Sequence, residues 1–176
     1  MWVSPLPNIQ VHSMLTIKIL EDKDWCIFRT LRLEALLDHP EAFGSSYDEE
    51  ANFSMEAFKD NYKKCDIFGA FLNEQLVGCA GFFVHSFTKM GHRGFLFAMY
   101  IRPDHRGFGI ADTLVKAIIK HARKKVIQIH LGVVTTNKIA VRLYEENGFR
   151  IYGTEPRAIK VKDAYYDEHW MVLNFE

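Results

Sequence analysis

The segment best suited to chemistry runs over residues 99–112, where an apolar strand pattern gives way to a glycine-containing loop and then to a helical pattern. Gly107 and Gly109 let the backbone approach a ligand closely, because glycine has no Cβ and tolerates left-handed backbone angles. The first turn of a helix leaves N–H groups without acceptors, and these groups favour an anion such as a diphosphate. We therefore expect an anion site at residues 106–112, with Arg106 as its local cation.

The spacing of this loop excludes the two commonest nucleotide-binding motifs. A G-x-G-x-x-G loop would need glycine at position 112, which is Asp112, and no G-x-x-x-x-G-K-[ST] sequence occurs in the chain. A tight turn followed by a capped helix would give the same glycine pattern without any ligand, so the loop alone does not decide between a site and a turn.

A second polar pattern lies on the predicted helix of residues 138–146. Asn137 and Tyr144 are seven residues apart, which is two helical turns with a drift of only about 20°, so both side chains share one face. Ala140 lies between them, and the three together make a shallow polar stripe that suits an extended ligand arm. The alternative is that Asn137 only caps the helix and Tyr144 is a half-buried core residue.

Together the two segments resemble the GNAT superfamily of N-acetyltransferases. Arg106-x-x-Gly109-x-Ala111 matches the Q/R-x-x-G-x-G/A motif of that family, and residues 137–149 are similar to its following helix, in the same order and at the same separation. Residues 31–36 and 40–46 also look like the opening of one bacterial subgroup, whose substrate the sequence does not identify. The resemblance covers about residues 14–175 and implies an α/β fold with a mixed, mostly antiparallel twisted sheet flanked by helices on both faces.

The resemblance also implies a cofactor, acetyl-CoA, and a role for each matching residue. The strand backbone would pair with the pantetheine arm at Met99, Tyr100 and Ile101. The pyrophosphate would be wrapped by the loop and helix start, namely Arg106, Gly107, Phe108, Gly109, Ile110, Ala111 and Asp112. Asn137 would contact the arm further along, and Tyr144 would protonate the leaving CoA thiolate. The acetyl group would pass directly to the primary amine of a small molecule or peptide, with no acyl-enzyme.

One departure from the family concerns the general base. Members that acetylate amines often carry a glutamate in one of the two strands that flank the cofactor. Here these strands contain residues 95–99 and 131–133, and Gly132 stands where such a carboxylate would be. The base is therefore unassigned. Its candidates are Glu34, Glu41, His92 and a water relayed by Asp167 and Glu168. The missing glutamate also leaves open an acyl-CoA-binding sensor without acceptor chemistry, and a ligand-free structural partner.

Composition limits the partners of the protein. Lys plus Arg and Asp plus Glu both number 22, so no net charge favours nucleic acid or an anionic membrane. The three cysteines form no C-x-x-C pair and no histidines form H-E-x-x-H, so we expect no metal and a reduced, cytoplasmic setting. The sequence leaves the oligomeric state open, with a homodimer as one option.

The elements that must position these residues follow from hydrophobic periodicity. We expect one acetyltransferase domain over residues 14–176, preceded by a loose extension at 1–13. Strands are predicted at 15–19, 66–72, 75–87, 95–101, 126–134, 150–152 and 169–175. Helices are predicted from an Asp22 cap to the residue before Pro40, from Ser54 to Tyr62, over 109–124 and over 138–146, with a loop at 43–53 and a hairpin turn at Asn73-Glu74.

Overall fold

A computed structural model of the protein describes residues 14–175, so the extension expected at residues 1–13 lies outside the described residues. Seven strands form one sheet in the order β1-β2-β3-β4-β5-β7-β6. They are β1 (Leu15–Ile19), β2 (Asp66–Leu72), β3 (Gln75–Val84), β4 (Arg93–Ile101), β5 (Gln128–Val134), β6 (Arg150–Val161) and β7 (Ala164–Asn174). All neighbouring pairs are antiparallel except β4 and β5, which are parallel. The expected mixed, mostly antiparallel sheet is confirmed.

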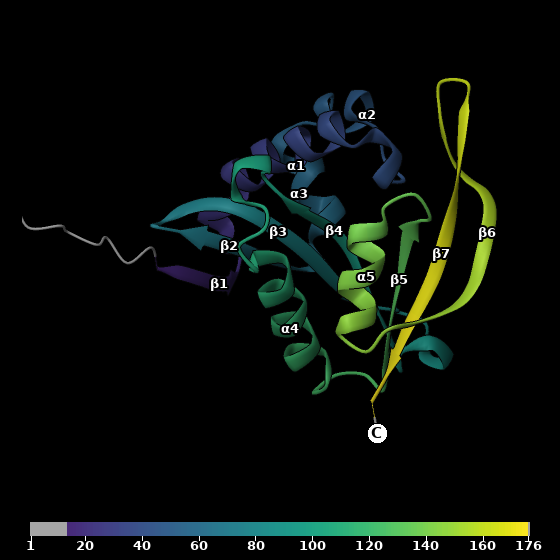
Figure 1. Cartoon of the computed structure of the whole chain (residues 1–176). Helices are drawn as coiled ribbons and strands as arrows, with labels where there is room; N and C mark the ends of the chain where they lie inside the picture. Colours follow the sequence, from purple (N-terminus) through teal and green to yellow (C-terminus); the bar gives the residue numbers. More distant parts are fainter. Residues whose placement is uncertain (1–13, 176) are drawn as a thin grey trace, which may run out of the picture.

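Helices cover both faces of this sheet (Figure 1). The helices are α1 (Trp25–Asp38), α2 (Tyr47–Ala51), α3 (Met55–Tyr62), α4 (Ile110–Ala122) and α5 (Lys138–Glu146). Single 3-10 turns lie at η1 (Asp22–Asp24), η2 (Pro40–Ala42), η3 (Thr88–Met90) and η4 (Pro103–His105). Helices α1 and α3 share one hydrophobic cluster with the sheet, and α4 and α5 share another. Within residues 14–175 no helix is long and apolar enough to cross a membrane.

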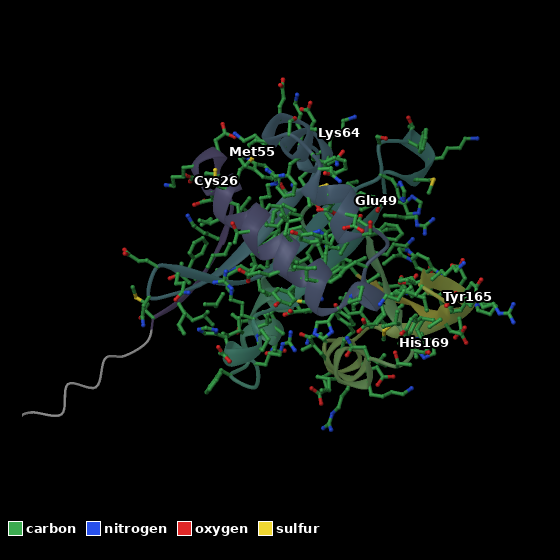
Figure 2. All side chains as sticks on the ribbon, turned by 90° about the horizontal axis from the view of Figure 1, so that it is seen from above. Cys26, Glu49, Met55, Lys64, Tyr165 and His169 are labelled. Atoms are coloured by element: carbon green, nitrogen blue, oxygen red, sulfur yellow. The ribbon has the colours of Figure 1, made fainter. Side chains whose placement is uncertain are left out.

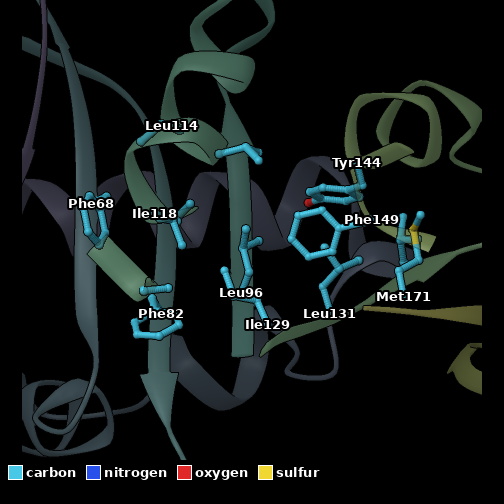
Figure 3. Close-up of a cluster of buried hydrophobic side chains, with 14 of the residues drawn as sticks. Phe68, Phe82, Leu96, Leu114, Ile118, Ile129, Leu131, Tyr144, Phe149 and Met171 are labelled. Carbon is cyan, nitrogen blue, oxygen red and sulfur yellow. The ribbon is translucent and has the colours of Figure 1, made fainter. Parts of the chain in front are cut away.

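The helix that follows the glycine loop is held by a continuous apolar stripe. Leu114 and Ile118 of α4 are fully buried, because their i, i+4 spacing places both on the face that meets the sheet. Figure 3 shows them beside Phe68, Phe82 and Leu96 of the sheet. Burial of each such side chain contributes about 1.5–3 kcal/mol, so this stripe fixes where α4 begins and hence where its free N–H groups point.

Two local predictions at the N-terminal end are wrong. Asp22 does not cap α1: it lies in the turn η1, whose cap is Glu21, and its carboxylate accepts a hydrogen bond from Trp25 Nε1 at 3.2 Å. Residues 43–53 are not a loop throughout, because they contain the short helix α2. Ser46 and Glu49 form a reciprocal capping box at the start of α2, which satisfies N–H groups that a loop would leave to water.

The two closing strands are much longer than the sequence predicted. Strands β6 and β7 form a hairpin that turns at Lys162, whose φ is 54°, and that projects beyond the rest of the sheet (Figure 1). Most of β6 is exposed, so it lacks the buried alternating face from which a strand is recognised. A register shift between Glu155 and Ile159 breaks its periodicity further.

Strands β4 and β5 separate part of the way along the sheet. They pair only through residues 93–95 of β4 and 128–130 of β5. Beyond that point β4 carries a bulge, where Ala98 has a φ of 52° and two residues of β4 face one residue of β3. The separation leaves backbone groups of β4 unpaired on the side that faces β5, and it opens a gap between the two strands.

Candidate active site

A cleft of about 700 Å³ follows the gap between β4 and β5. One end is formed by the loop before α4, and the other reaches Phe97 and Phe43 on the side of α1. The structure brings the predicted site residues together in its walls: Met99, Tyr100, Ile101, Arg106, Gly107, Gly109, Ile110, Ala111, Asp112, Asn137 and Tyr144. Phe108 is the exception, because its side chain is 78% exposed and does not line the cleft.

The loop before α4 presents unpaired N–H groups to this cleft. Gly107 and Gly109 have φ angles of 83° and 75°, in the left-handed region that favours glycine, and no atom lies within 4 Å of a Cβ built on either residue. The N–H groups of residues 107–112 make no hydrogen bond within residues 14–175. A row of free donors at the start of a helix of 13 residues suits a diphosphate.

Arg106 holds the loop in place through its side chain. Its Nε donates to the Ile101 carbonyl at 2.8 Å, and its Nη2 lies 3.1 Å from His39 Nε2. The guanidinium also lies over the Tyr100 ring, 5.6 Å from the centroid. The cation therefore stands at the anion end of the cleft, and the side chain ties the loop to β4 and to the end of α1.

Asp112 links the start of α4 to the end of α5. Its carboxylate accepts from Lys116 Nζ at 2.7 Å and from Asn147 Nδ2 at 2.9 Å, and Asn147 is the C-cap of α5. The Lys116 ammonium, followed by the Asn147 amide, holds the pKa of Asp112 below its usual range. The paired lysine thus offsets a negative charge next to the proposed diphosphate position.

Asn137 caps its helix, as the structural interpretation of the sequence expected, and its contact with the cofactor arm stays a prediction. Its Oδ1 accepts from the Ala140 N–H at 3.1 Å and caps α5, while the residue remains exposed and lines the cleft. Helix capping uses only the carbonyl oxygen, so the amide nitrogen stays available to a ligand.

Tyr144 is buried, yet its residue lines the cleft. Its ring is 5% exposed and packs against Phe149 with the centroids 5.8 Å apart. Figure 3 shows the hydroxyl pointing away from Met171, towards the strand that carries Leu96. This hydroxyl makes no hydrogen bond within residues 14–175, and burial raises the pKa of Tyr144. A neutral phenol with a free donor therefore stands in the cleft wall.

On β4 the backbone and not the side chains provides the polar groups of the cleft wall. The side chain of Tyr100 turns to the other face of the sheet, where its hydroxyl donates to Asp38 of α1. Ile101 packs into the core with α4. The two residues therefore line the cleft chiefly with their main chain, as an extended pantetheine arm would require.

The candidate bases differ in their hydrogen-bond partners and in whether they line the cleft. Glu34 is paired with Arg102, at 2.7 and 2.9 Å, and Asp167 accepts from the Arg157 N–H at 2.8 Å. His92 lies just before β4, outside the cleft walls. Glu41 lines the cleft, with His39 Nδ1 at 3.3 Å from its carboxylate. Glu168 lies on β7 next to Gly132, which is itself a cleft residue.

Sequence reasoning missed a second cavity, of about 680 Å³, between the helices and β4. Phe97 lines both cavities. The walls of the second one include the buried pair Arg32 and Glu50, joined at 2.7 Å, with Tyr62 donating to the same carboxylate at 3.1 Å. An arginine on the otherwise apolar face of α1 was the available signal, because a buried charge requires a partner.

One lining residue of the second cavity lies on the side of the C-terminal hairpin. Figure 2 shows Glu49, another of its lining residues, on the side of the helical layer nearer the hairpin that carries Tyr165 and His169. Cys26 and Met55 lie on the opposite side of that layer. Phe97 is thus the residue common to the walls of both cavities.

Comparisons with known proteins agree with this geometry. The family described as Acetyltransferase (GNAT) family matches residues 29–149. Over 155 residues the chain is 28% identical to the mycothiol acetyltransferase of Thermobispora bispora, covering 83% of this chain and 50% of that protein. Over 122 residues it is 30% identical to the acetyltransferase PseH of Campylobacter jejuni, covering 68% of each. The chain therefore spans about half the length of the first of these relatives.

The fold is shared with solved structures. The putative acetyltransferase yncA of Salmonella typhimurium, solved with its cofactor acetyl-CoA, superposes with a TM-score of 0.77 at 20% identity. The match covers 93% of this chain and 95% of that one. At this identity the likeness establishes the fold.

Proposed function

Because the chain belongs to the acetyltransferase (GNAT) family, we propose that it is an acetyl-CoA-dependent N-acetyltransferase that moves the acetyl group directly to a primary amine of a small molecule or peptide. The observation that carries this proposal is the cleft itself, which joins a row of free N–H donors at one end to a buried phenol at its centre.

The cofactor is proposed to lie along the cleft with its diphosphate at residues 106–112. The free N–H groups of residues 107–112 and the Arg106 guanidinium supply donors and positive charge there. The pantetheine arm would then run between β4 and β5, where β4 has unpaired backbone groups and Asn137 offers its amide. This order places the thioester near Tyr144.

Tyr144 is proposed to assist the departure of the CoA thiolate. A neutral phenol can donate a hydrogen bond to sulfur as negative charge develops on it, and the raised pKa keeps the phenol neutral at physiological pH. None of the three cysteines lines the cleft: Cys79 is buried, and burial raises the pKa of its thiol to about 12. Direct transfer therefore suits these residues better than an acyl-enzyme.

The acceptor is proposed to enter from the side of Phe97, which lines both cavities. Phe43 lines the cleft on the same side, next to α1. A cytoplasmic location, a homodimer and the lack of nucleic-acid or membrane partners stay predictions from the sequence.

An amine screen tests this function. Purified protein is incubated with acetyl-CoA and a library of primary amines, including amino acids, polyamines and short peptides, and free thiol is measured together with the mass of each acceptor. We expect thiol release that depends on the amine, with one acetyl group gained by the acceptor. CoA binding without transfer to any amine would instead support a sensor, and no binding of CoA would contradict the site.

A further inference from the structure

Gly132 of β5 makes room for a carboxylate from a different strand. A Cβ added at Gly132 would lie 2.6 Å from both Cδ and Oε1 of Glu168, and 2.9 Å from its Oε2. Gly132 is exposed and lines the cleft, just beyond the point where β4 and β5 separate. The Glu168 carboxylate therefore occupies the space that a side chain at position 132 would fill, next to the wall of the cleft.

The register of the sheet explains this approach. Glu168 of β7 pairs with Val134, and Trp170 pairs with Gly132, so Glu168 is the diagonal neighbour of the glycine on the same face. Only a residue without a side chain lets a glutamate lean across in this way. Position 132 therefore has no side chain of its own, and the carboxylate of Glu168 lies in the space that such a side chain would fill.

Glu168 differs from the other carboxylates around the cavities in having no partner. Within residues 14–175 the carboxylate of Glu168 makes no hydrogen bond and no salt bridge. By contrast, Glu34 is held by Arg102 and Glu50 by Arg32, while Glu155 accepts from Trp170 Nε1 at 3.0 Å. A free carboxylate can accept a proton without first breaking an ion pair.

We propose that Glu168 is the general base of the acetyl transfer and replaces the carboxylate that Gly132 lacks. The inference rests on the proposed function. The substrate class that follows is a primary amine that arrives as its ammonium ion, because only the ammonium ion must lose a proton before its nitrogen can attack.

The environment of Glu168 suits this role. Partial burial, and then the charge of Glu155 on β6, raise the pKa of Glu168 above its usual range and towards working pH. Other titratable groups of the neighbouring elements on this side are His130 on β5, Tyr152 on β6, Tyr166 on β7, and Glu41 on η2, which packs against β5 and β6. None of these groups donates a hydrogen bond to Glu168.

Glu168 takes one proton from the ammonium ion and passes it to solvent, and the amine lone pair then forms the C–N bond to the acetyl carbonyl carbon. The C–S bond breaks as the tetrahedral intermediate collapses. The nitrogen then releases its second proton to solvent, and this balances the proton that the CoA thiolate takes up from solvent. Tyr144 keeps its own proton and donates a hydrogen bond to the sulfur.

The test compares the pH dependence of kcat/KM for wild type, Glu168→Gln and Glu155→Gln, using the best primary amine from the screen. Glu168→Gln keeps the shape of the side chain and removes its basicity, so we expect a loss of about 100-fold at neutral pH. The loss should shrink as the pH approaches the pKa of the amine, because solution then supplies the neutral form. The dissociation constant of CoA should not change.

Glu155→Gln is the matched control, because it removes a charge beside Glu168 and keeps an acceptor for Trp170. Its plateau rate should equal that of wild type, while the acid limb of the profile moves to lower pH. Gly132→Ala is a second variant, which keeps Glu168 but crowds its carboxylate and should lower the plateau.

An unchanged profile for Glu168→Gln overturns the role of Glu168, as does an equal loss at every pH combined with weaker CoA binding. In either case, transfer of the acetyl group to an amine by the wild-type protein would still support the proposed function. No transfer to any amine overturns both the inference and the proposed function.

Discussion

Replacement of Tyr144 by phenylalanine tests the chemical step at the centre of the cleft. The substitution removes one oxygen and keeps the ring packing against Phe149. Because the Tyr144 hydroxyl makes no hydrogen bond within residues 14–175, its removal leaves no partner unsatisfied. We therefore expect little change in the free energy of unfolding, so that any loss of turnover reports on chemistry.

The size of the effect follows from the pKa values involved. A thiol has a pKa of about 8.5 and a free phenol about 10, so full proton transfer to the thiolate would run uphill by about 2 kcal/mol. Burial raises the pKa of Tyr144 and makes that transfer harder still. The phenol thus acts mainly by donating a hydrogen bond to sulfur, an interaction with a charged acceptor that contributes about 1.5–3 kcal/mol. This corresponds to a loss of about 10- to 150-fold in kcat.

The assay measures single-turnover rates and the dissociation constant of acetyl-CoA for wild type and Tyr144→Phe. Affinity should barely change, because the hydrogen bond strengthens only as charge builds on sulfur in the transition state. Tyr152→Phe is the control, since its hydroxyl lies 3.2 Å from His130 Nδ1, away from the cleft, and it should keep the wild-type rate. An unchanged single-turnover rate for Tyr144→Phe would return Tyr144 to a purely structural role.

Three further substitutions test the surroundings. Gly109→Ala adds a Cβ at a φ of 75°, which costs about 1–2 kcal/mol of stability. It should also weaken CoA binding, measured by calorimetry, by about tenfold. Gly153→Ala, which has equally open space around its Cβ, is the control and should change neither stability nor CoA affinity. Glu50→Gln leaves Arg32 buried without its counter-charge, so the free energy of unfolding in urea should fall by about 3 kcal/mol. Because the pKa of Glu168 is raised in the folded protein, its ionisation lowers the stability of the fold as the pH rises through that pKa. Glu168→Gln should therefore raise the Tm at pH 7 but not at pH 4. Equal Tm differences at the two pH values would contradict this.

The parts of the site that the sequence predicted are those encoded locally. The apolar stripe of α4 and the glycines before it specify a strand, a loop and a helix start within about a dozen residues, and these elements appear in the structure as predicted. Helix α5 has the predicted bounds for the same reason. Helix α2 has only five residues, too few for a period to show, although Ser46-x-x-Glu49 is a capping-box signal that could have revealed it.

The parts that were missed depend on pairings between distant residues. Glu168 approaches Gly132 only because of the register between β5 and β7, which no local pattern specifies. The pair of Arg32 and Glu50 joins α1 to α2 across 18 positions, and α2 itself was not predicted. The proposed base could therefore not be chosen from the sequence, whereas the glycine loop before α4 could be located.

Amide hydrogen exchange, resolved by residue, tests the central claim most directly. The N–H groups of residues 107–112 make no hydrogen bond within the described part of the chain, so they should exchange rapidly in the free protein. Saturating CoA should slow their exchange strongly, and NAD or ATP at the same concentration should do so far less. Protection by CoA confined to other residues, or none at all, would contradict a diphosphate site at the start of α4.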